Sequence, residues 1–480
     1  MMQRWVRIPD PRSRIPDVAA DPHTIAELAR ALKARELTVE SVVDGCLQRI
    51  GQRNATLNAF ITVFEESARV QAREADMEIA AGRYRGPLHG VPISVKDLFD
   101  VAGAPTTAAS RVRQNHVAAH DAPSIARLRD AGAIIVGKTN LHEFAFGTTN
   151  EDSAFGPARH PLDPSRSPGG SSGGSAASVA DGMCFASMGT DTGGSIRIPA
   201  AICGLVGLKP AVGELPTEGV VPLSTTLDHV GPICRSVDDA AILYDALRGG
   251  SARPPGKPID LRAVRLGIPR TYFLSLLDAQ VSAAFESACE RLRDAGATLE
   301  DVPIPHAGDV AAIYLHIVLT EAAAYHARTL DRRPEDYTPN VRIRLEMGRY
   351  VLGEDYARAL RGRELIRREV DAALEGVDAL VVPAVPIPAP KIGVATIRIG
   401  AVEEPVRNVM LRCTQAFNVS GHPAISLPCG TTTEGLPIGA QIVGALGETP
   451  GLLRVAQAVE PIVSARAAAH ANYLGPGKSR

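Results

Sequence analysis

Two serines in a glycine-rich stretch have the surroundings that nucleophilic attack on a carbonyl carbon requires. The stretch, residues 167–200, begins Ser-Pro-Gly-Gly-Ser-Ser-Gly-Gly and continues to Gly-Thr-Asp-Thr-Gly-Gly-Ser-Ile-Arg-Ile-Pro. Ser171 and Ser195 stand 24 positions apart in it, and a pair of glycines precedes each. Glycine lets backbone N–H groups approach a reacting group closely, and such N–H groups can stabilise an oxyanion. The pattern therefore indicates a serine nucleophile beside an oxyanion hole of backbone donors.

Two other interpretations of this stretch are weaker. A phosphate-binding loop would need a Lys-Ser/Thr pair at Walker spacing, or Gly-x-Gly-x-x-Gly followed by an acidic ribose anchor, and neither is present. A flexible linker is the commonest meaning of Gly/Ser-rich composition. However, Ser195 is followed by Ile-Arg-Ile-Pro, which is a specific and inflexible sequence. The stretch is therefore better explained as a site.

From Gly169 to Ala200 the chain resembles, position for position, the consensus of the amidase signature family. Residues 90–97, 137–144 and 418–424 resemble the same family, so the resemblance covers most of residues 24–445. It implies an amide-hydrolysing enzyme that works through an acyl-enzyme. It also implies an α/β fold in which a large mixed β-sheet is covered by α-helices on both faces.

The resemblance implies a catalytic triad of Lys96, Ser171 and Ser195. In it Ser195 is the nucleophile, Ser171 is a bridging residue in a cis peptide, and Lys96 is the base. A lysine can be a base only if its pKa falls far enough for the neutral amine to exist, and desolvation can lower it. Composition alone favours a surface lysine, because buried lysines are rare. The Pro-Ile-Ser-Val-Lys-Asp context of Lys96 reverses that preference.

The same resemblance assigns supporting roles to the residues around the nucleophile. The implied oxyanion hole consists of the backbone N–H groups of Thr192, Gly193, Gly194 and Ser195. Asp191 and Arg197 flank this segment, and we expect them to hold it rigid. Ser172 either hydrogen-bonds within the same network or is only a small packing residue.

Other catalytic chemistries receive less support from the sequence. The base of a Ser-His-Asp enzyme would have to be chosen from His142, His160, His229 and His422. None of these lies in a triad-like context, and a lone histidine is more often structural. The seven cysteines are scattered and never in Cys-x-x-Cys spacing: Cys46, Cys184, Cys203, Cys234, Cys289, Cys413 and Cys429. We therefore expect reduced thiols, no metal and no cofactor.

The composition limits the partners and the location. A net charge of −2 over 480 residues provides no electrostatic footprint for nucleic acid or an anionic membrane. The N-terminus lacks a signal-peptide core, and no later run approaches the ~18 apolar residues of a membrane span. We expect a soluble, cytoplasmic monomer or homodimer that acts with water on a small amide or carbamate, without nucleic-acid or membrane partners.

Several segments indicate how the chain positions these residues. Residues 91–95 predict a short buried strand that ends at Lys96. The heptapeptide Arg-Leu-Arg-Asp-Ala-Gly-Ala occurs at 127–133 and 291–297, and each copy predicts a helix end, a C′ glycine and a following strand. Residues 266–269 add a strand before the second copy. The resulting strand–helix–strand order predicts an α/β fold with a partly parallel sheet.

Longer segments support coarser expectations. Residues 55–81 continue a helical pattern, and residues 310–375 predict long helices with solvated charged faces. Further strands are predicted at 381–382, 424–428 and 438–444. Each of these segments contributes to the sheet or to the helices that cover it.

A single large domain is the preferred organisation. We expect residues 1–22 to form an N-terminal arm and residues 23–475 to form one domain. The segment 249–259 is the best candidate for a linker, but a surface loop is favoured because loops are commoner than domain boundaries. Within the domain, residues 305–415 are expected to be the variable helical region that shapes the substrate pocket.

The family contains free-standing amidases and the A subunit of the tRNA-dependent amidotransferase, which releases ammonia from glutamine. In the amidotransferase an acidic residue binds the amino group of glutamine, and in this chain Leu411 occupies the corresponding position. Arg344 matches a carboxylate-binding arginine of the amidotransferase, although free amidases often have arginine there too. The balance favours a free amidase with an apolar pocket.

A degenerate scaffold would lack Lys96, Ser171 or Ser195, and all three are present. Aryl or alkyl amides, cyclic amides and carbamates remain open as substrates.

Overall fold

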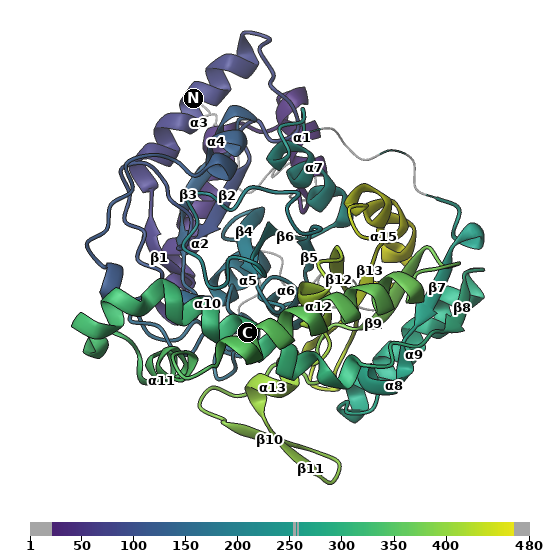
Figure 1. The fold of residues 1–480 in the computed structure, drawn as a ribbon. Helices are drawn as coiled ribbons and strands as arrows, with labels where there is room; N and C mark the ends of the chain where they lie inside the picture. The colour runs from purple at the N-terminus through teal and green to yellow at the C-terminus, as the bar shows by residue number, and fades with distance from the viewer. Residues whose placement is uncertain (1–21, 253–255, 257–258, 465–480) are drawn as a thin grey trace, which may run out of the picture.

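The computed structural model describes residues 22–252, 256 and 259–464 (Figure 1). The expected N-terminal arm therefore lies outside the described residues apart from Pro22, and so does the expected domain end at residue 475. The segment 249–259 is described only in part. The assignment of residues 23–475 to one domain stays a prediction.

An eleven-stranded mixed sheet forms the core, in the order β1-β3-β2-β4-β6-β5-β12-β13-β9-β7-β8. Its strands are β1 Phe60–Val63, β2 Pro92–Lys96, β3 Ile134–Thr139, β4 Ala186–Asp191, β5 Val206–Lys209, β6 His229–Cys234, β7 Arg265–Ile268, β8 Thr298–Asp301, β9 Ala379–Pro383, β12 Ala424–Thr431 and β13 Pro437–Val443. Strand β2 is parallel to β3 and β4, and β7 is parallel to β8 and β9, whereas the other pairs are antiparallel. A separate hairpin, β10 Thr396–Ile399 and β11 Val402–Pro405, extends away from the sheet (Figure 1). The predicted α/β fold with a mixed sheet is confirmed.

Helices surround this sheet. They are α1 Ile25–Ala34, α2 Val39–Leu57, α3 Glu65–Ala80, α4 Pro123–Asp130, α5 Gly173–Ala180, α6 Arg197–Ile202, α7 Val237–Leu247, α8 Arg270–Phe273, α9 Ala279–Asp294, α10 Val310–Arg332, α11 Pro339–Gly348, α12 Gly353–Ala373, α13 Val406–Leu411, α14 Ala416–Val419 and α15 Thr449–Val463. Helices α5 and α6 pack on the central strands, and α15 packs on β12 between α7 and α9. Helices α10 and α12 cross in front of the sheet in the view of Figure 1.

Strand β2 ends where the sequence predicted, at Lys96. All five of its residues are buried, and it lies between β3 and β4. Because β2 and β4 are parallel, with Val95 opposite Met188, their carboxyl ends meet at one edge of the sheet. Lys96 and the segment that follows Asp191 therefore come together at that edge.

Both copies of the repeated heptapeptide have the predicted local structure. The first ends α4, and Gly132 adopts φ +92° before β3 begins. The second ends α9, and Gly296 adopts φ +104° before β8 begins. This left-handed backbone favours glycine because a side chain would be strained there. The two copies thus close two separate helix-to-strand connections of the sheet.

The predicted helix over 55–81 is wrong in its first part. Helix α2 ends at Leu57, and Asn58 turns the chain with a positive φ of 49°. Residues 60–63 then form β1, which pairs antiparallel with the end of β3. The sequence Phe-Ile-Thr-Val has high β propensity, and pairing with a buried neighbour outweighs the helical periodicity. Strand β1 is consequently one edge of the large sheet.

We predicted that no stretch of apolar residues is long enough to span a membrane, and one described helix departs from this prediction. Among the described residues, the helix Ala307–Arg332 is long and apolar enough to cross a membrane by length and composition. Half of its most apolar window is buried inside the fold, where Ile317 and Val318 are fully covered. Core helices satisfy the same length and composition test.

Candidate active site

Lys96 is a fully buried amine without a carboxylate partner. Its Nζ donates to Ser171 Oγ and to Thr190 Oγ1, each at 2.7 Å. Within the described part of the chain, no carboxylate forms an ion pair with it. Burial lowers the pKa of Lys96 to about 7, although the charges of Asp228 and Asp191 act in the opposite direction. A substantial neutral fraction therefore exists near neutral pH.

Ser171 bridges from Lys96 toward the glycine-rich segment. The Gly170–Ser171 peptide bond is cis, as the family resemblance implied. Ser171 is fully buried just before α5, and its carbonyl accepts the backbone N–H of His142 at 3.0 Å. Its Oγ accepts a hydrogen bond from Lys96 Nζ. The structure thus brings Lys96 and Ser171 into direct contact.

Ser195 is the member of the implied triad that solvent can reach. It lies between β4 and α6 and keeps 5% of its surface exposed, against 0% for Lys96 and Ser171. Its carbonyl accepts the N–H of Ser172 at 3.2 Å, and Ser172 Oγ donates to Thr190 O at 3.3 Å. Across the described residues, no hydrogen bond joins Ser195 Oγ to Ser171 Oγ. Ser195 is therefore tied to the bridge through the backbone of Ser172.

The segment before Ser195 presents backbone donors in a space that only glycine can occupy. No protein acceptor pairs with the N–H groups of residues 192–195 in the described ranges. A Cβ on Gly193 would lie 2.7 Å from Tyr314 Oη and 3.0 Å from Leu411 Cδ2. Gly194 adopts φ +140°, and a Cβ there would collide with Thr414. These donors are thus free to bind a developing oxyanion.

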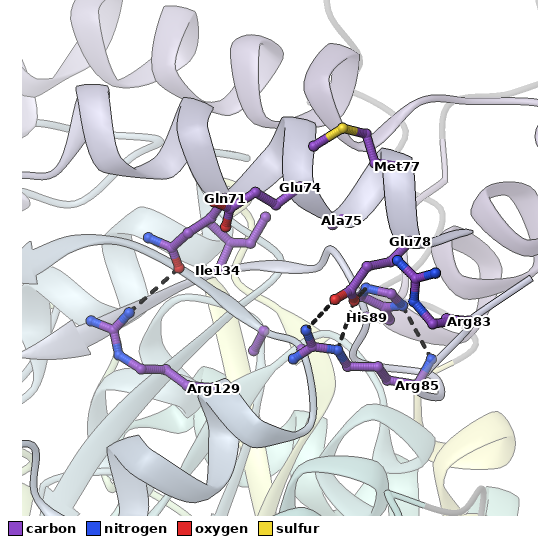
Figure 2. Close-up of a pocket in the computed structure, with 12 residues that line it drawn as sticks. Gln71, Glu74, Ala75, Met77, Glu78, Arg83, Arg85, His89, Arg129 and Ile134 are labelled. Carbon is purple, nitrogen blue, oxygen red and sulfur yellow. Dashed lines mark hydrogen bonds and ion pairs between the residues drawn. The ribbon is translucent and has the colours of Figure 1, made fainter. Parts of the chain in front are cut away.

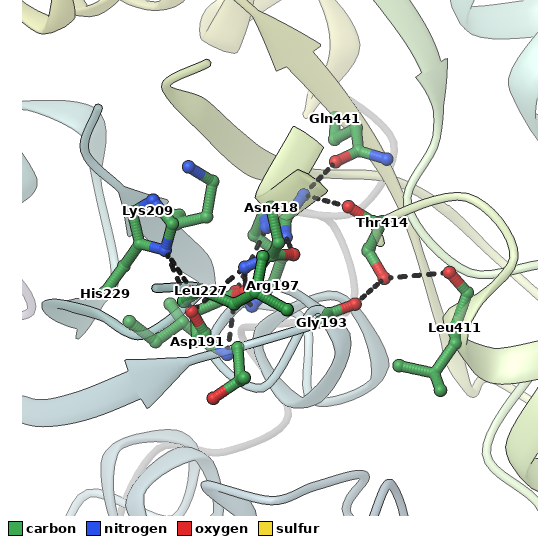
Figure 3. Close-up of polar contacts among 12 residues, drawn as sticks. Asp191, Gly193, Arg197, Lys209, Leu227, His229, Leu411, Thr414, Asn418 and Gln441 are labelled. Carbon is green, nitrogen blue, oxygen red and sulfur yellow. Dashed lines mark hydrogen bonds and ion pairs between the residues drawn. The ribbon is translucent and has the colours of Figure 1, made fainter. Parts of the chain in front are cut away.

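An ion pair inside the fold supports this segment (Figure 3). Arg197 Nη2 lies 2.9 Å from Asp191 Oδ1, and both side chains are fully buried. Arg197 also donates to Thr414 O at 3.0 Å and to Asn418 Oδ1 at 2.6 Å, while Thr414 Oγ1 donates to Gly193 O at 2.6 Å. Burial alone would raise the pKa of Asp191, but Arg197 holds it well below its usual range. The network has the geometry needed to hold the segment rigid.

Sequence reasoning missed several residues of this site. Thr190, Thr414 and Asn418 were given no role, although Asn418 lies in a segment that carries the family resemblance. Only the pairing of β2 with β4 places Thr190 next to Lys96. Asp228 was also missed: it accepts from Thr192 Oγ1 at 2.6 Å, and burial raises its pKa to about 6.

The alternative histidine bases are held elsewhere. Their ring nitrogens contact Asp152 for His142, Ile202 O for His160, Leu227 O for His229, and Asp371 for His422. Burial lowers the pKa of all four imidazoles. No described contact joins a ring nitrogen of these four to Ser171 Oγ or Ser195 Oγ. The geometry therefore favours Lys96 over a histidine as the base.

Residues 192–195, which carry the expected oxyanion-hole donors, are called the oxyanion segment below. A cavity of about 350 Å³ adjoins this segment. Tyr314 and Leu411 line it, and both contact the position of Gly193. Leu315 and Val409 contribute apolar surface, but Arg407 lines the same cavity. The expectation of an apolar pocket is therefore wrong in part. It rested on Leu411 alone, and the sequence did not show that Arg407 lies in the same cavity.

Figure 2 shows a second cavity, of about 450 Å³, whose lining includes none of Lys96, Ser171 and Ser195. It is bounded by α3 and by the turn that carries Arg85 and His89, and Ile134 lies at its inner end. Ile134 begins β3, whereas Lys96 ends the parallel strand β2. The second cavity thus lies at the amino-terminal end of these parallel strands, whereas Lys96 lies at their carboxyl-terminal end.

Metal and thiol chemistry have no visible centre in the described ranges. No group of three or more His, Cys, Asp or Glu side chains there is arranged to hold a metal ion. All seven cysteines are described, and each is free and buried.

Comparisons with known proteins agree with this geometry. The family model Amidase matches residues 41–453. An amidase of Pseudomonas putida is 40% identical over 428 residues, which cover 86% of this chain and 90% of that protein. The A subunit of glutamyl-tRNA(Gln) amidotransferase from Anaeromyxobacter sp. (strain K) is 38% identical over 474 residues, covering 91% and 95%. A solved structure described as a crystal structure of amidase superposes with a TM-score of 0.87 at 38% identity, covering 92% of this chain and 100% of that one.

Proposed function

This chain belongs to the amidase family and is an amide-hydrolysing enzyme, and from this premise we propose that it acts alone on small amides through an acyl-enzyme formed on Ser195. Linear aryl or alkyl amides are the proposed main substrates. Carbamates and cyclic amides are chemically related candidates, because their carbonyl carbons undergo the same attack. The expected monomeric or homodimeric state and cytoplasmic location stay predictions.

The proposed reaction begins with a proton relay. Neutral Lys96 accepts the proton of Ser171 across their 2.7 Å contact, and Ser171 accepts the proton of Ser195. Ser195 Oγ must rotate toward Ser171 for this transfer, and catalytic hydrogen bonds commonly tighten only when substrate binds. The resulting alkoxide attacks the amide carbon, and the oxygen of the carbonyl becomes the oxyanion.

The remaining steps use the same groups in turn. The N–H groups of Thr192, Gly193, Gly194 and Ser195 stabilise the oxyanion, each donor contributing roughly 3 kcal/mol in such sites. As the C–N bond breaks, the proton held on Lys96 returns through Ser171 to the leaving nitrogen. Water then attacks the acyl-enzyme, the relay accepts its proton, and Ser195 is released with its hydrogen restored. Each turnover therefore consumes one amide and one water.

A single observation carries this proposal: Lys96 is fully buried, contacts Ser171, and has a pKa lowered to about 7 by burial. A general base is most effective when its pKa lies near the working pH. A surface lysine, with a pKa near 10.5, would be almost entirely protonated there. The environment of Lys96 thus supports a catalytic role and not a structural one.

The alternative function is the glutamine-hydrolysing A subunit of a tRNA-dependent amidotransferase. The 38% identity to a protein of that name favours it. Leu411 opposes it, because its Cδ2 lies beside Gly193 where an acidic residue would be needed to hold the ammonium group of glutamine. The free-standing amidase is therefore the better-supported proposal.

The decisive experiment uses the purified chain without partners. We expect hydrolysis of p-nitroacetanilide, poor hydrolysis of glutamine, and fluorophosphonate labelling of Ser195 detected by mass spectrometry. Ser195→Ala should abolish both turnover and that label, whereas Ser172→Ala should retain the label on Ser195. Efficient glutamine hydrolysis, or activity that appears only with added partner proteins, would favour the alternative. Labelling confined to another serine would contradict the assignment of the nucleophile.

A further inference from the structure

Arg407 is a positive charge beside the candidate active site that no protein carboxylate neutralises. It belongs to α13 and lines the 350 Å³ cavity with Tyr314 and Leu411. Its Nε is buried and has no hydrogen-bond partner. Glu404 lines the same cavity, but across the described residues Arg407 forms no ion pair with it or with any other carboxylate. Leaving a guanidinium unpaired in a partly buried place is costly, so a ligand is the natural partner.

The cavity adjoins Gly193 through two of its lining side chains. Tyr314 Oη and Leu411 Cδ2 lie within 2.7 and 3.0 Å of the Cβ position of Gly193, in the oxyanion segment. The same two side chains line the cavity together with Arg407. A group bound to Arg407 is therefore separated from the oxyanion segment by no more than one layer of side chains. This is the distance scale of a small substrate.

Arg344, on α11, adds a second positive charge near enough to Arg407 for the two guanidinium groups to repel each other. Its Nη1 donates to Phe146 O at 2.6 Å, and its guanidinium lies 5.8 Å from the centre of the Phe146 ring. The nearby carboxylate, Asp152, is already engaged by His142 at 3.1 Å and by Asn340 at 3.2 Å. Burial, and then repulsion from Arg407, lower the pKa of Arg344 to about 10. The region thus keeps an excess of positive charge.

We propose that the substrate of this site is an anionic amide whose carboxylate binds Arg407. A guanidinium and a carboxylate match in geometry and can form paired charge-assisted hydrogen bonds. Arg344 strengthens the positive field around that carboxylate. Leu411 supplies no negative charge for an ammonium group, so the preferred substrate is a simple anion and not a zwitterionic amino acid. This inference rests on the proposed function for the position of the scissile amide.

Matched substrate pairs test the proposal. Succinamate and butyramide have chains of similar length, and so do glutaramate and valeramide, but only the first of each pair carries a carboxylate. We expect the wild type to prefer the anion. Arg407→Met should lower the ratio of kcat/KM for anion over neutral amide roughly 10- to 150-fold, as for the loss of a charged hydrogen bond. Arg407→Lys should keep part of the preference.

The matched control is Arg398→Met, which removes the same charge from the exposed hairpin, where Arg398 pairs with Glu403 at 3.2 Å. It should leave the anion-to-neutral ratio unchanged. Circular dichroism should confirm that each variant is folded. Equal or better hydrolysis of the neutral amides by the wild type would overturn the proposal, and so would an Arg407→Met ratio equal to that of the wild type.

A binding measurement separates this proposal from the proposed function. Calorimetric titration of succinate into Ser195→Ala requires no turnover. We expect binding that weakens with added salt and that Arg407→Met reduces in the Ser195→Ala background. If the wild type hydrolyses no amide but succinate binds in this way, the proposed function is wrong and the anion site stands. If neither succinate nor glutarate binds, the anion site is wrong whatever the enzyme hydrolyses.

Discussion

Two lysines on neighbouring strands have the same burial and opposite surroundings. Lys96 ends β2, and Lys138 lies on β3 opposite Val95. Both side chains are fully buried. Lys138 Nζ lies 2.7 Å from Asp97 Oδ1 and also donates to Thr106 Oγ1 at 2.8 Å. Lys96 Nζ donates to the hydroxyls of Ser171 and Thr190, and no carboxylate of the described residues forms an ion pair with it.

The difference teaches that burial alone does not distinguish a structural lysine from a base. Burial lowers the pKa of Lys138 too, but Asp97 at contact distance opposes that shift because a carboxylate stabilises the ammonium form. Hydroxyls stabilise it much less, so Lys96 can lose its proton near neutral pH. At equal burial, the carboxylate partner distinguishes Lys138 from Lys96, and the lysine without such a partner is the better candidate for a base.

The largest expected effect comes from removing the unpaired amine. Lys96→Ala should lower kcat/KM for anilides by roughly 10⁴-fold or more, as for other members of catalytic triads. Ser171→Ala should cause a similar loss, because it interrupts the same relay. The double variant should be scarcely worse than either single variant. Steady-state kinetics on all three tests this, and multiplicative losses would mean that the two residues act independently.

The next prediction concerns the free energy of unfolding. Here the larger loss is expected from replacing Lys138 and not Lys96. Lys138→Met leaves Asp97 buried without its partner and should destabilise the fold by about 3–5 kcal/mol. Lys96→Met leaves no buried carboxylate without its partner, so the free energy of unfolding should fall little or even rise. Denaturant unfolding of both variants measures the contrast. Similar losses of stability would show that the ion pair does not distinguish the two sites.

The pH dependence should report the lowered pKa of Lys96. Below about pH 7 the amine is protonated, so kcat/KM should fall nearly tenfold per pH unit toward acid. Folding lowers this pKa from 10.5 to about 7, so between these values the unfolded chain binds more protons. The contribution of Lys96 to stability should therefore rise with pH across that window, by up to about 1.4 kcal/mol per unit.

Comparison with Lys96→Met isolates that contribution, because other buried groups titrate in both proteins. We expect the stability difference between wild type and variant to move in favour of the wild type from pH 7 to pH 10. A difference that is independent of pH would show that Lys96 keeps its ordinary pKa.

The smallest effect should come from Thr190, one of the two hydroxyls that hold Lys96. Thr190→Val removes an acceptor of the ammonium protons, so the pKa of Lys96 should fall further and the acid limb should shift to lower pH. We also expect a loss of roughly tenfold in kcat/KM from poorer positioning of the amine. Thr298→Val, at an exposed position of β8 at the far end of the strand order, is the matched control, and its acid limb should not move.

Local sequence patterns predicted the elements that depend on neighbouring residues. The end of β2 at Lys96 and both heptapeptide turns follow from short stretches whose propensities and glycines act locally. Strand β1 could not be predicted in this way, because its partner is the end of β3. The same holds for the site: Thr190 contacts a lysine 94 positions away. Arg407 went unnoticed because only the fold shows that its buried Nε has no hydrogen-bond partner among the described residues.

The Asp191–Arg197 network has a consequence for the order of events during synthesis. Arg197 binds Asn418, 221 positions later, and Gln441, 244 positions later. Lys96, Ser171 and Ser195 have all left the ribosome long before these partners are translated. The nascent chain therefore carries all three residues of the proposed triad while the segment 192–195 still lacks the support of this network. Hydrolytic competence should consequently arise only at the end of translation, when β12 and β13 join the sheet.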